Sequence, residues 1–312
     1  MKTFKTILLF GSLCLVLVIP ANAATFNLTV TDAAWTASGP LGYDPYDSNE
    51  YTQAVNIDLD FEVDEDTDYV VTFTKGSSTT YTRTAHSGIN EIEYSLLADP
   101  NKTNKPLKDY PDIKKTTDVL FGTVGVTDTT PLTLTYYAFV PRRQEVEPGD
   151  YTDTFTIKVY DGTAKRPGAL HDSEDVNITI PAQDLLQLAL GTNEFGEAGG
   201  VTVNFGNVVG GEVKNLKVKV RSNRGYRLYA QSINNQALAH IDPGVSSIFN
   251  YFYTLDNIAY DLSGGGSIEI AGSSTKTSKN GDRYNSAVTI GDVTMAVAGD
   301  YSDTIIYTVS DY

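Results

Sequence analysis

The chain has 312 residues, of which 41% are hydrophobic and 11% aromatic, enough to form the cores of two domains of ordinary size. Its formal net charge is −16. Nucleic acids and anionic membranes attract surfaces rich in Lys and Arg, so this charge argues against both as partners.

The first 23 residues have the features of a secretory signal peptide. Lys2 and Lys5 precede an apolar run over residues 7–19, and residues 21–23 (Ala-Asn-Ala) provide a small-residue cleavage site. The run is too short for a comfortable membrane span. Cleavage before Ala24 leaves 289 residues (312 − 23) and takes the net charge from −16 to −18. It also removes the only cysteine, so the exported chain has no thiol for disulfides, metal ligation or catalysis.

After the signal peptide, hydrophobic residues alternate with polar ones in many short segments. Alternation puts the apolar side chains on one face of a strand and the polar ones on the other. The connections are rich in Gly, Asp, Asn, Ser and Pro, and no long stretch keeps a helical period. This pattern predicts antiparallel β-sandwiches. The alternating sets are Phe26/Leu28/Val30, Val55/Ile57/Leu59/Phe61/Val63, Leu132/Leu134/Tyr136, Phe155/Ile157/Val159, Val176/Ile178/Ile180, Leu216/Val218/Val220 and Ile305/Tyr307/Val309.

One segment of the chain occurs twice, 150 residues apart. Residues 149–161 are GDYTDTFTIKVYD, and residues 299–311 are GDYSDTIIYTVSD, with seven of thirteen positions identical. The apolar positions keep their register, and a slip of one residue would turn the whole apolar face to water. The repeat therefore predicts two copies of one domain, residues 24–182 and 183–312, with the boundary near Pro181.

The two copies differ after the repeated strand. In the first copy a loop leads to one more alternating strand, residues 176–181, whereas the second copy stops at Tyr312. We therefore predict an all-β fold of two tandem immunoglobulin-like antiparallel β-sandwich domains, the second lacking its final strand. Such a strand buries about three or four apolar side chains, worth about 5–10 kcal/mol. Its absence leaves an open sheet edge, which proteins normally cover.

A family resemblance accompanies the repeat. Residues 139–154, FVPRRQEVEPGDYTDT, resemble the closing motif of spore coat U domains, in which a short I-P segment is followed by P-[AG]-G-x-Y-x-D-T and an alternating terminal strand. Residues 297–304, VAGDYSDT, match the second half of this motif. Spore coat U domains are the pilins of archaic chaperone–usher pili, and two-domain members resemble their tip adhesins. Many such domains carry cysteines, which the exported part of this chain lacks.

The resemblance implies a tip adhesin or a tip-like minor subunit of such a pilus, exported through the periplasm to the cell surface, with roles in cell adhesion and biofilm formation. The implied partners are a periplasmic pilus chaperone, an outer-membrane usher and an adjacent pilin. By donor-strand complementation, the chaperone and then the pilin would insert a strand into the second domain. The implied acceptor residues lie in the last strand: Tyr301, Ile305, Tyr307 and Val309.

The start of the chain bears on its place in the fibre. Pilins of this family donate an N-terminal extension to a neighbour. Here the first strand begins at about Thr25, directly after the predicted cleavage site, so no donor segment is expected and a tip position follows. The alternative is that residues 26–30 are themselves the donor.

Two long irregular segments of the first domain carry aromatic residues among turn residues, at 35–53 and 98–115. Exposed rings there would suit contact with a glycan or another hydrophobic surface. The alternative is that the rings fold back and form a small satellite core. The candidate adhesive residues are Trp35, Tyr43, Tyr46, Tyr51 and Tyr110.

The sequence predicts no catalytic, metal or cofactor site. Residues 64–68, DEDTD, resemble the start of a calcium loop. However, Tyr69 stands where the sharp turn needs Gly, and Lys75 stands where the bidentate Glu belongs, so we interpret the segment as a solvated acidic turn. The three histidines are scattered without zinc-ligand spacing. We therefore expect a protein that is not an enzyme. The alternative to an adhesin is a structural stalk or coat subunit without a specific ligand.

Overall fold

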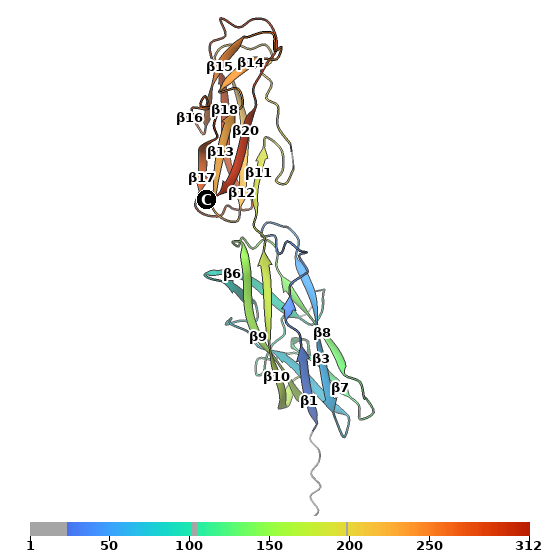
Figure 1. The fold of residues 1–312 in the computed structure, drawn as a ribbon. Helices are drawn as coiled ribbons and strands as arrows, with labels where there is room; N and C mark the ends of the chain where they lie inside the picture. The colour runs from blue at the N-terminus through green and yellow to red at the C-terminus, as the bar shows by residue number, and fades with distance from the viewer. Residues whose placement is uncertain (1–23, 102–104, 198) are drawn as a thin grey trace, which may run out of the picture.

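The computed structural model describes residues 24–101, 105–197 and 199–312, so the predicted signal peptide lies outside the described residues. Figure 1 shows two β-sandwiches arranged end to end, which we call sandwich 1 (β1–β10) and sandwich 2 (β11–β20). The predicted all-β, immunoglobulin-like fold is confirmed. The predicted domain limits, 24–182 and 183–312, stay a prediction.

Sandwich 1 consists of β1 (Thr25–Val30), β2 (Ala33–Ala34), β3 (Tyr51–Glu62), β4 (Thr67–Phe73), β5 (Arg83–Ser87), β6 (Asn90–Leu97), the 3-10 helix η1 (Thr116–Asp118), β7 (Leu120–Val124), β8 (Leu132–Val140), β9 (Gly149–Thr163) and β10 (Arg166–Ala182). Sandwich 2 consists of β11 (Leu186–Leu190), β12 (Val213–Ser222), β13 (Tyr226–Ser232), β14 (Ala237–His240), β15 (Ile248–Leu255), β16 (Ile258–Tyr260), β17 (Ile268–Ser273), β18 (Asp282–Ile290), β19 (Tyr301–Ser302) and β20 (Ile305–Asp311).

In sandwich 1 one layer has the strand order β1-β3-β8-β6, and the other has β7-β4-β9-β10-β2. The hairpin of β5 and β6 joins the layers, because β6 pairs with β8 and β5 pairs with β9. The alternating residues predicted on β3, β9 and β10 point between the layers, where Ile57, Ile157 and Ile180 are fully buried. Burial of these faces is the main stabilising contribution to such a fold.

Sandwich 2 repeats most of this topology. The order β11-β12-β18-β15-β14 corresponds to β1-β3-β8-β6-β5. Strand β13 lies between β17 and β20, as β4 lies between β7 and β9. Together β19 and β20 take the place of β9. In the described part of sandwich 2, two strands of sandwich 1 have no counterpart: β10 and its partner β2.

The repeated GDY sequence forms the same local structure in both sandwiches. The hydroxyl of Tyr151 donates to the carbonyl of Glu147 at 2.9 Å, and that of Tyr301 donates to the carbonyl of Val297 at 2.8 Å. A tyrosine bonded to the backbone a few residues upstream is the tyrosine corner of immunoglobulin-like folds. The glycine two positions before each tyrosine has a φ of 144° or 151°, which side chains disfavour. The motif therefore fixes the backbone conformation where the chain enters the last repeated strand of each sandwich.

The aspartate that follows in the motif joins the two layers. Asp153 is buried, and its Oδ2 accepts the hydroxyl of Tyr94 from β6 at 2.7 Å. Its Oδ1 accepts the backbone N–H of Ser77 at 3.1 Å and of Thr154 at 2.9 Å. In sandwich 2 Asp303 accepts the matching set of donors, from Tyr251, Asn234 and Thr304. The conserved spacing of the repeat thus preserves a hydrogen-bonded link between the sheets.

Replacing this aspartate tests the link. We expect Asp153→Ala to lower the free energy of unfolding of sandwich 1 by about 2–3 kcal/mol, since it leaves the buried hydroxyl of Tyr94 and two partly buried backbone N–H groups without their acceptor. The single tryptophan, Trp35, is buried in sandwich 1, so its fluorescence reports unfolding of that sandwich selectively. The matched control is Asp150→Ala, an exposed aspartate in the same motif, which should change stability by less than about 0.5 kcal/mol. Equal effects of the two changes would contradict this role.

Candidate functional site: an open strand edge

The last strand of sandwich 2 is paired on one side. Strand β20 pairs with β13 from Ile305 to Asp311, and no other described strand pairs with it. Its counterpart β9 pairs with β4 on one side and with β10 along nearly its whole length on the other. The backbone donors and acceptors on the outer edge of β20 therefore have no partner among the described strands, whereas their counterparts on β9 pair with β10.

Side-chain exposure differs between these two strands in the same way. On β9 the inward-facing Phe155, Ile157 and Val159 are at most 1% exposed. The three equivalent side chains of β20 are Ile305, Tyr307 and Val309, and all of them are partly exposed although they pack against the core of sandwich 2. Because the two strands share one register, we attribute the difference to the covering strand.

A second strand borders the same region. Leu186, Leu188 and Leu190 of β11 are partly exposed, whereas Phe26 and Leu28 of the equivalent β1 are buried. Strands β11 and β20 lie side by side without pairing. We call these three leucines together with Ile305, Tyr307 and Val309 the open edge. The sequence prediction missed the leucines, although their alternation over residues 186–190 is the signal that could have revealed them.

An arginine holds the two strands at one end of the open edge. The guanidinium of Arg224 lies 2.5 Å from the carboxylates of Asp184, before β11, and of Asp311, at the end of β20. Figure 1 places this C-terminal end of sandwich 2 next to sandwich 1. The ion pairs connect the strands by side chains where no backbone hydrogen bond does.

Of the four predicted acceptor residues, the structure brings three together and places the fourth elsewhere. Tyr301 lies on β19, pairs with His240 of β14 and packs against Phe249 with ring centroids 4.8 Å apart. Its hydroxyl makes the tyrosine corner. Tyr307 lies within the open edge, and its hydroxyl is 2.7 Å from that of Ser286. Burial raises the pKa of Tyr307 above its ordinary value of 10.0, so the phenol stays neutral. The acceptor role stays a prediction.

The predicted adhesive aromatics lie in different surroundings. Trp35, Tyr43 and Tyr46 are 6%, 0% and 7% exposed, and Trp35 and Tyr43 belong to the main core of sandwich 1, not to a separate satellite core. Tyr51 is partly exposed and contacts Tyr43 edge to face with centroids 5.6 Å apart. Tyr110 alone is largely exposed, at 55%. A ligand-binding role for these residues stays a prediction.

Tyr46 connects the two sandwiches. Its hydroxyl donates to the carbonyl of Ser222 at 2.6 Å, and the carbonyl of Thr277 is 3.1 Å away. The guanidinium of Arg221 lies 5.0 Å from the ring centroid. Burial raises the pKa of Tyr46 to about 12, so the phenol remains a donor at all physiological pH values. The ring is therefore an interdomain contact.

Further contacts surround this joint. Asn223 donates its amide to the carbonyls of Val146 at 3.2 Å and Gln183 at 2.7 Å, and the carboxylate of Glu145 accepts the backbone N–H of Lys279 at 2.9 Å. Residues 145–146 belong to the loop before β9, so the segment that resembles the family motif also contacts sandwich 2.

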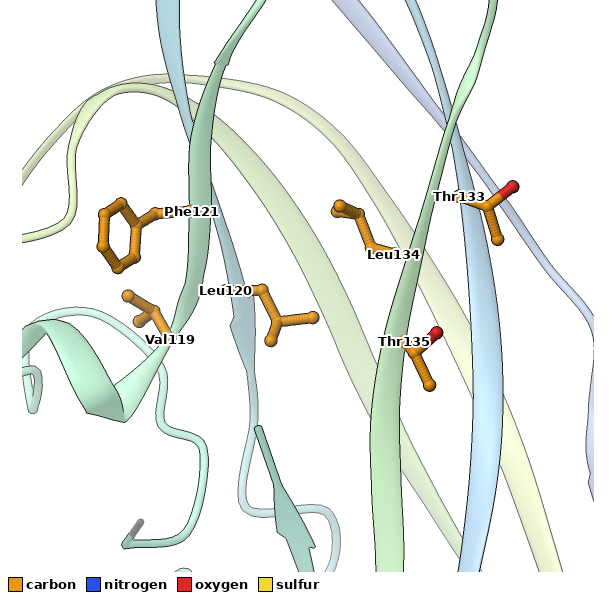
Figure 2. A pocket seen from close by; sticks show the side chains of 6 residues that line it. All are labelled: Val119, Leu120, Phe121, Thr133, Leu134 and Thr135. Carbon is orange, nitrogen blue, oxygen red and sulfur yellow. The ribbon is translucent and has the colours of Figure 1, made fainter. Parts of the chain in front are cut away.

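Sandwich 1 has a shallow pocket of about 310 Å³ between β7 and β8. Figure 2 shows Leu120 and Leu134 pointing into the space between these strands. The hydroxyls of Thr133 and Thr135 donate to side chains on the neighbouring β3, at 2.8 and 2.9 Å. The pocket therefore presents apolar surface, and none of the predicted site residues lines it.

Across residues 24–101, 105–197 and 199–312, no group of three His, Cys, Asp or Glu side chains is arranged to hold a metal ion. Within the same residues, no helix is long and apolar enough to cross a membrane.

Comparison with solved structures finds several pilus adhesins at low sequence identity. The CsuC–CsuE chaperone–tip adhesion subunit complex from archaic chaperone–usher Csu pili of Acinetobacter baumannii is 13% identical, with a TM-score of 0.44, over 91% of this chain and 99% of that chain. The CupB6 tip adhesin from Pseudomonas aeruginosa is 11% identical, with a TM-score of 0.43, over 91% and 94%. CfaE, the adhesive subunit of CFA/I fimbria of enterotoxigenic Escherichia coli, is 11% identical, with a TM-score of 0.29, over 92% and 87%.

None of the curated proteins compared with this chain matches it. The family model of the Spore Coat Protein U domain matches residues 21–158, which extend from the predicted cleavage site into β9 and include the segment 139–154 that resembles the family's closing motif. The N-terminal part of this chain is therefore similar to a spore coat U domain.

Proposed function

We propose that this protein is a tip adhesin or tip-like minor subunit of an archaic chaperone–usher pilus, and that it joins the fibre by donor-strand complementation of sandwich 2. The observation that carries the proposal is the unequal cover of two equivalent strands: β9 has β10 beside it, whereas β20 has a free edge. An uncovered edge beside partly exposed apolar side chains is a site for strand addition.

The strand that closes sandwich 1 indicates what the site takes. Along β10 the inward-facing Val176, Ile178 and Ile180 are at most 1% exposed, and the strand runs antiparallel to β9. The partner is therefore an extended segment with apolar residues at alternate positions. A periplasmic chaperone and then an adjacent pilin, placed by an outer-membrane usher, would supply it in turn.

The position of β1 supports a place at the tip. Phe26 and Leu28 are buried in the core of sandwich 1, and β1 pairs with β3 over all six of its residues. This strand therefore serves its own sandwich and is not the donor for a neighbour. A subunit that accepts a strand through sandwich 2 and keeps β1 for itself ends the fibre, with sandwich 1 outermost at the cell surface. Its role is binding and assembly, not catalysis.

A peptide binding assay tests the acceptor site. The probe is a fluorescein-labelled peptide with the sequence of residues 174–183, titrated into the chain from Ala24 and followed by fluorescence anisotropy. We expect saturable binding with a Kd in the micromolar range, and a loss of at least about tenfold in Tyr307→Asp, since a charge at the open edge has to be desolvated when the strand enters.

The matched control is Thr308→Asp, the exposed neighbour on the opposite face of β20, which should leave the affinity within about twofold. Both variants must keep the far-UV circular dichroism of the parent chain. Binding weaker than about 1 mM in the parent, or equal losses in the two variants, would speak against an acceptor site at the open edge.

A further inference from the structure

Sandwich 1 has a second pocket, on the outer face of its β4-containing layer. Strands β4 and β7, the 3-10 helix η1 and the turn between β9 and β10 line it, and its volume is about 340 Å³, which is in the range of small-ligand sites. Strand β9 begins beside the joint with sandwich 2 and runs for 15 residues to Thr163, so the turn that follows lies toward the far end of sandwich 1 (Figure 1). We call this site the outer pocket.

One wall of the outer pocket is an exposed aromatic ring. Phe121 on β7 is 54% exposed. Figure 2 shows its side chain and that of Leu120 on opposite sides of the strand, so Phe121 points away from the core that Leu120 packs against. A large apolar ring left in water at the wall of a pocket gains burial when a ligand packs against its face.

A carboxylate stands next to this ring. Asp68 on β4 is exposed and lies opposite Thr123 of β7, whose hydroxyl donates to its Oδ1 at 2.6 Å. Among the described residues no second donor bonds this carboxylate, so Oδ2 is available as an acceptor. The acidic segment 64–68, which resembles the start of a calcium loop, therefore ends in a side chain that lines the outer pocket.

Hydrogen-bond donors line another wall. Thr163 and Lys165 are exposed residues of the turn between β9 and β10. This turn has a defined shape: Asp161 Oδ1 accepts the N–H of Ala169 at 2.6 Å, and Gly162 has a φ of 92°, which side chains disfavour. The hydroxyl and the ammonium group are therefore presented from a fixed turn.

The loop before η1 is fixed by a buried carboxylate. Asp118 Oδ2 accepts the N–H of Lys114 at 2.9 Å and of Lys115 at 3.1 Å, and it also accepts the ammonium group of Lys108 at 3.1 Å. These bonds position the exposed Thr116, which adds a further hydroxyl to the pocket.

These groups together fit a sugar ring. A pyranose has hydroxyl groups that both donate and accept hydrogen bonds, and its ring C–H groups form an apolar face. The exposed ring of Phe121 matches that face, while the free carboxylate oxygen and the opposing donors match the hydroxyls. The carboxylate of Asp68 disfavours an anionic sugar, since like charges at short distance repel.

From these observations, and resting on the proposed function, we propose that the outer pocket binds one neutral pyranose unit of a surface glycan. Phe121 packs against the apolar face of the sugar, Asp68 accepts a hydrogen bond from one of its hydroxyls, and Lys165 donates to another. The pocket lies toward the end of sandwich 1 opposite the joint, which is the end that a tip subunit presents outward.

Saturation-transfer NMR on the chain from Ala24 tests the outer pocket. The probes are methyl β-D-galactopyranoside, methyl β-D-glucopyranoside and methyl α-D-mannopyranoside, which differ in the orientation of their hydroxyls. We expect saturable binding of at least one of them with a Kd of about 1 mM, as befits a ligand of this size. Phe121→Ala should raise this Kd by at least about tenfold, because it removes the ring that the sugar covers.

The matched control is Phe252→Ala, a phenylalanine of sandwich 2 that is 63% exposed; it should leave the Kd within about twofold. A second pair tests the carboxylate. Asp68→Asn should raise the Kd by about fivefold, because a charged acceptor bonds more strongly than a neutral one. Asp60→Asn, at an exposed position of β3, should leave it within about twofold. None of these side chains is buried, and an unchanged unfolding transition by Trp35 fluorescence verifies that sandwich 1 stays intact.

Three outcomes would overturn the inference: a Kd weaker than about 50 mM for all three glycosides, equal effects of Phe121→Ala and Phe252→Ala, or binding only of the anionic methyl glycoside of N-acetylneuraminic acid. The labelled peptide of residues 174–183 reports on sandwich 2 separately. Peptide binding without glycoside binding would overturn the outer pocket and leave donor-strand complementation intact. Glycoside binding without peptide binding would overturn donor-strand complementation and leave the outer pocket as a sugar site.

Discussion

A second copy of residues 163–183, fused after Tyr312, is expected to raise the free energy of unfolding of sandwich 2 by about 5 kcal/mol, through burial of the apolar side chains of the strand and of the open edge. The repeat places Tyr312 at the position of Gly162, so the fused copy continues from β20 as β10 continues from β9. For a domain of this size the change corresponds to a rise in Tm of roughly 15 °C. Differential scanning calorimetry measures it, while Trp35 fluorescence identifies the transition of sandwich 1.

The control fusion has the same length and hairpin but carries Asn at the three positions copied from Val176, Ile178 and Ile180. Without apolar side chains to bury, it should shift the Tm of sandwich 2 by less than about 3 °C. A Tm of sandwich 2 that is the same for both fusions would show that the open edge gains nothing from a complementary strand.

The same isoleucine truncation is expected to have unequal consequences in the two sandwiches. Ile157→Ala, at a fully buried position of β9, should cost about 4 kcal/mol in the free energy of unfolding of sandwich 1, since it removes buried methyl groups and leaves a cavity. Ile305→Ala, on the partly exposed β20, should cost about 1–2 kcal/mol, since that side chain loses less burial. Denaturant titrations of the two transitions provide both values.

The fused chain supplies the control for this comparison. When the second copy of residues 163–183 covers β20, Ile305→Ala should cost about 3 kcal/mol, because the side chain is then enclosed as its counterpart in sandwich 1 is. An Ile305→Ala cost that does not change on fusion would mean that the covering strand does not reach Ile305.

Much of the fold could be predicted from local patterns. The alternating residues over 55–63, 155–159 and 176–180 form strands that bury the predicted faces, because a period of two has the same meaning wherever a strand packs on one side. The repeated motif correctly indicated two related sandwiches. The structure adds the physical reason for its spacing: a tyrosine corner and an aspartate that joins the layers.

The candidate site was predicted less completely, because it depends on contacts between distant segments. Tyr301 shares the alternation of the last strand, yet its pairing with β14 removes it from the open edge. The leucines of β11 were not predicted to border it. Tyr43 and Tyr46 look like exposed loop aromatics in the sequence, but Tyr43 lies in the core and Tyr46 lies at the joint between the sandwiches.

By itself, the sequence determined the fold class, the duplication and the register of the strands, because alternation and turn residues act over a few neighbouring positions. The tertiary structure decided which strand edges are covered and which rings are buried. Both properties depend on whether a segment far away in the chain lies alongside. Strand β9 and strand β20 have nearly the same local pattern, and only the presence of β10 beside one of them makes their surfaces different.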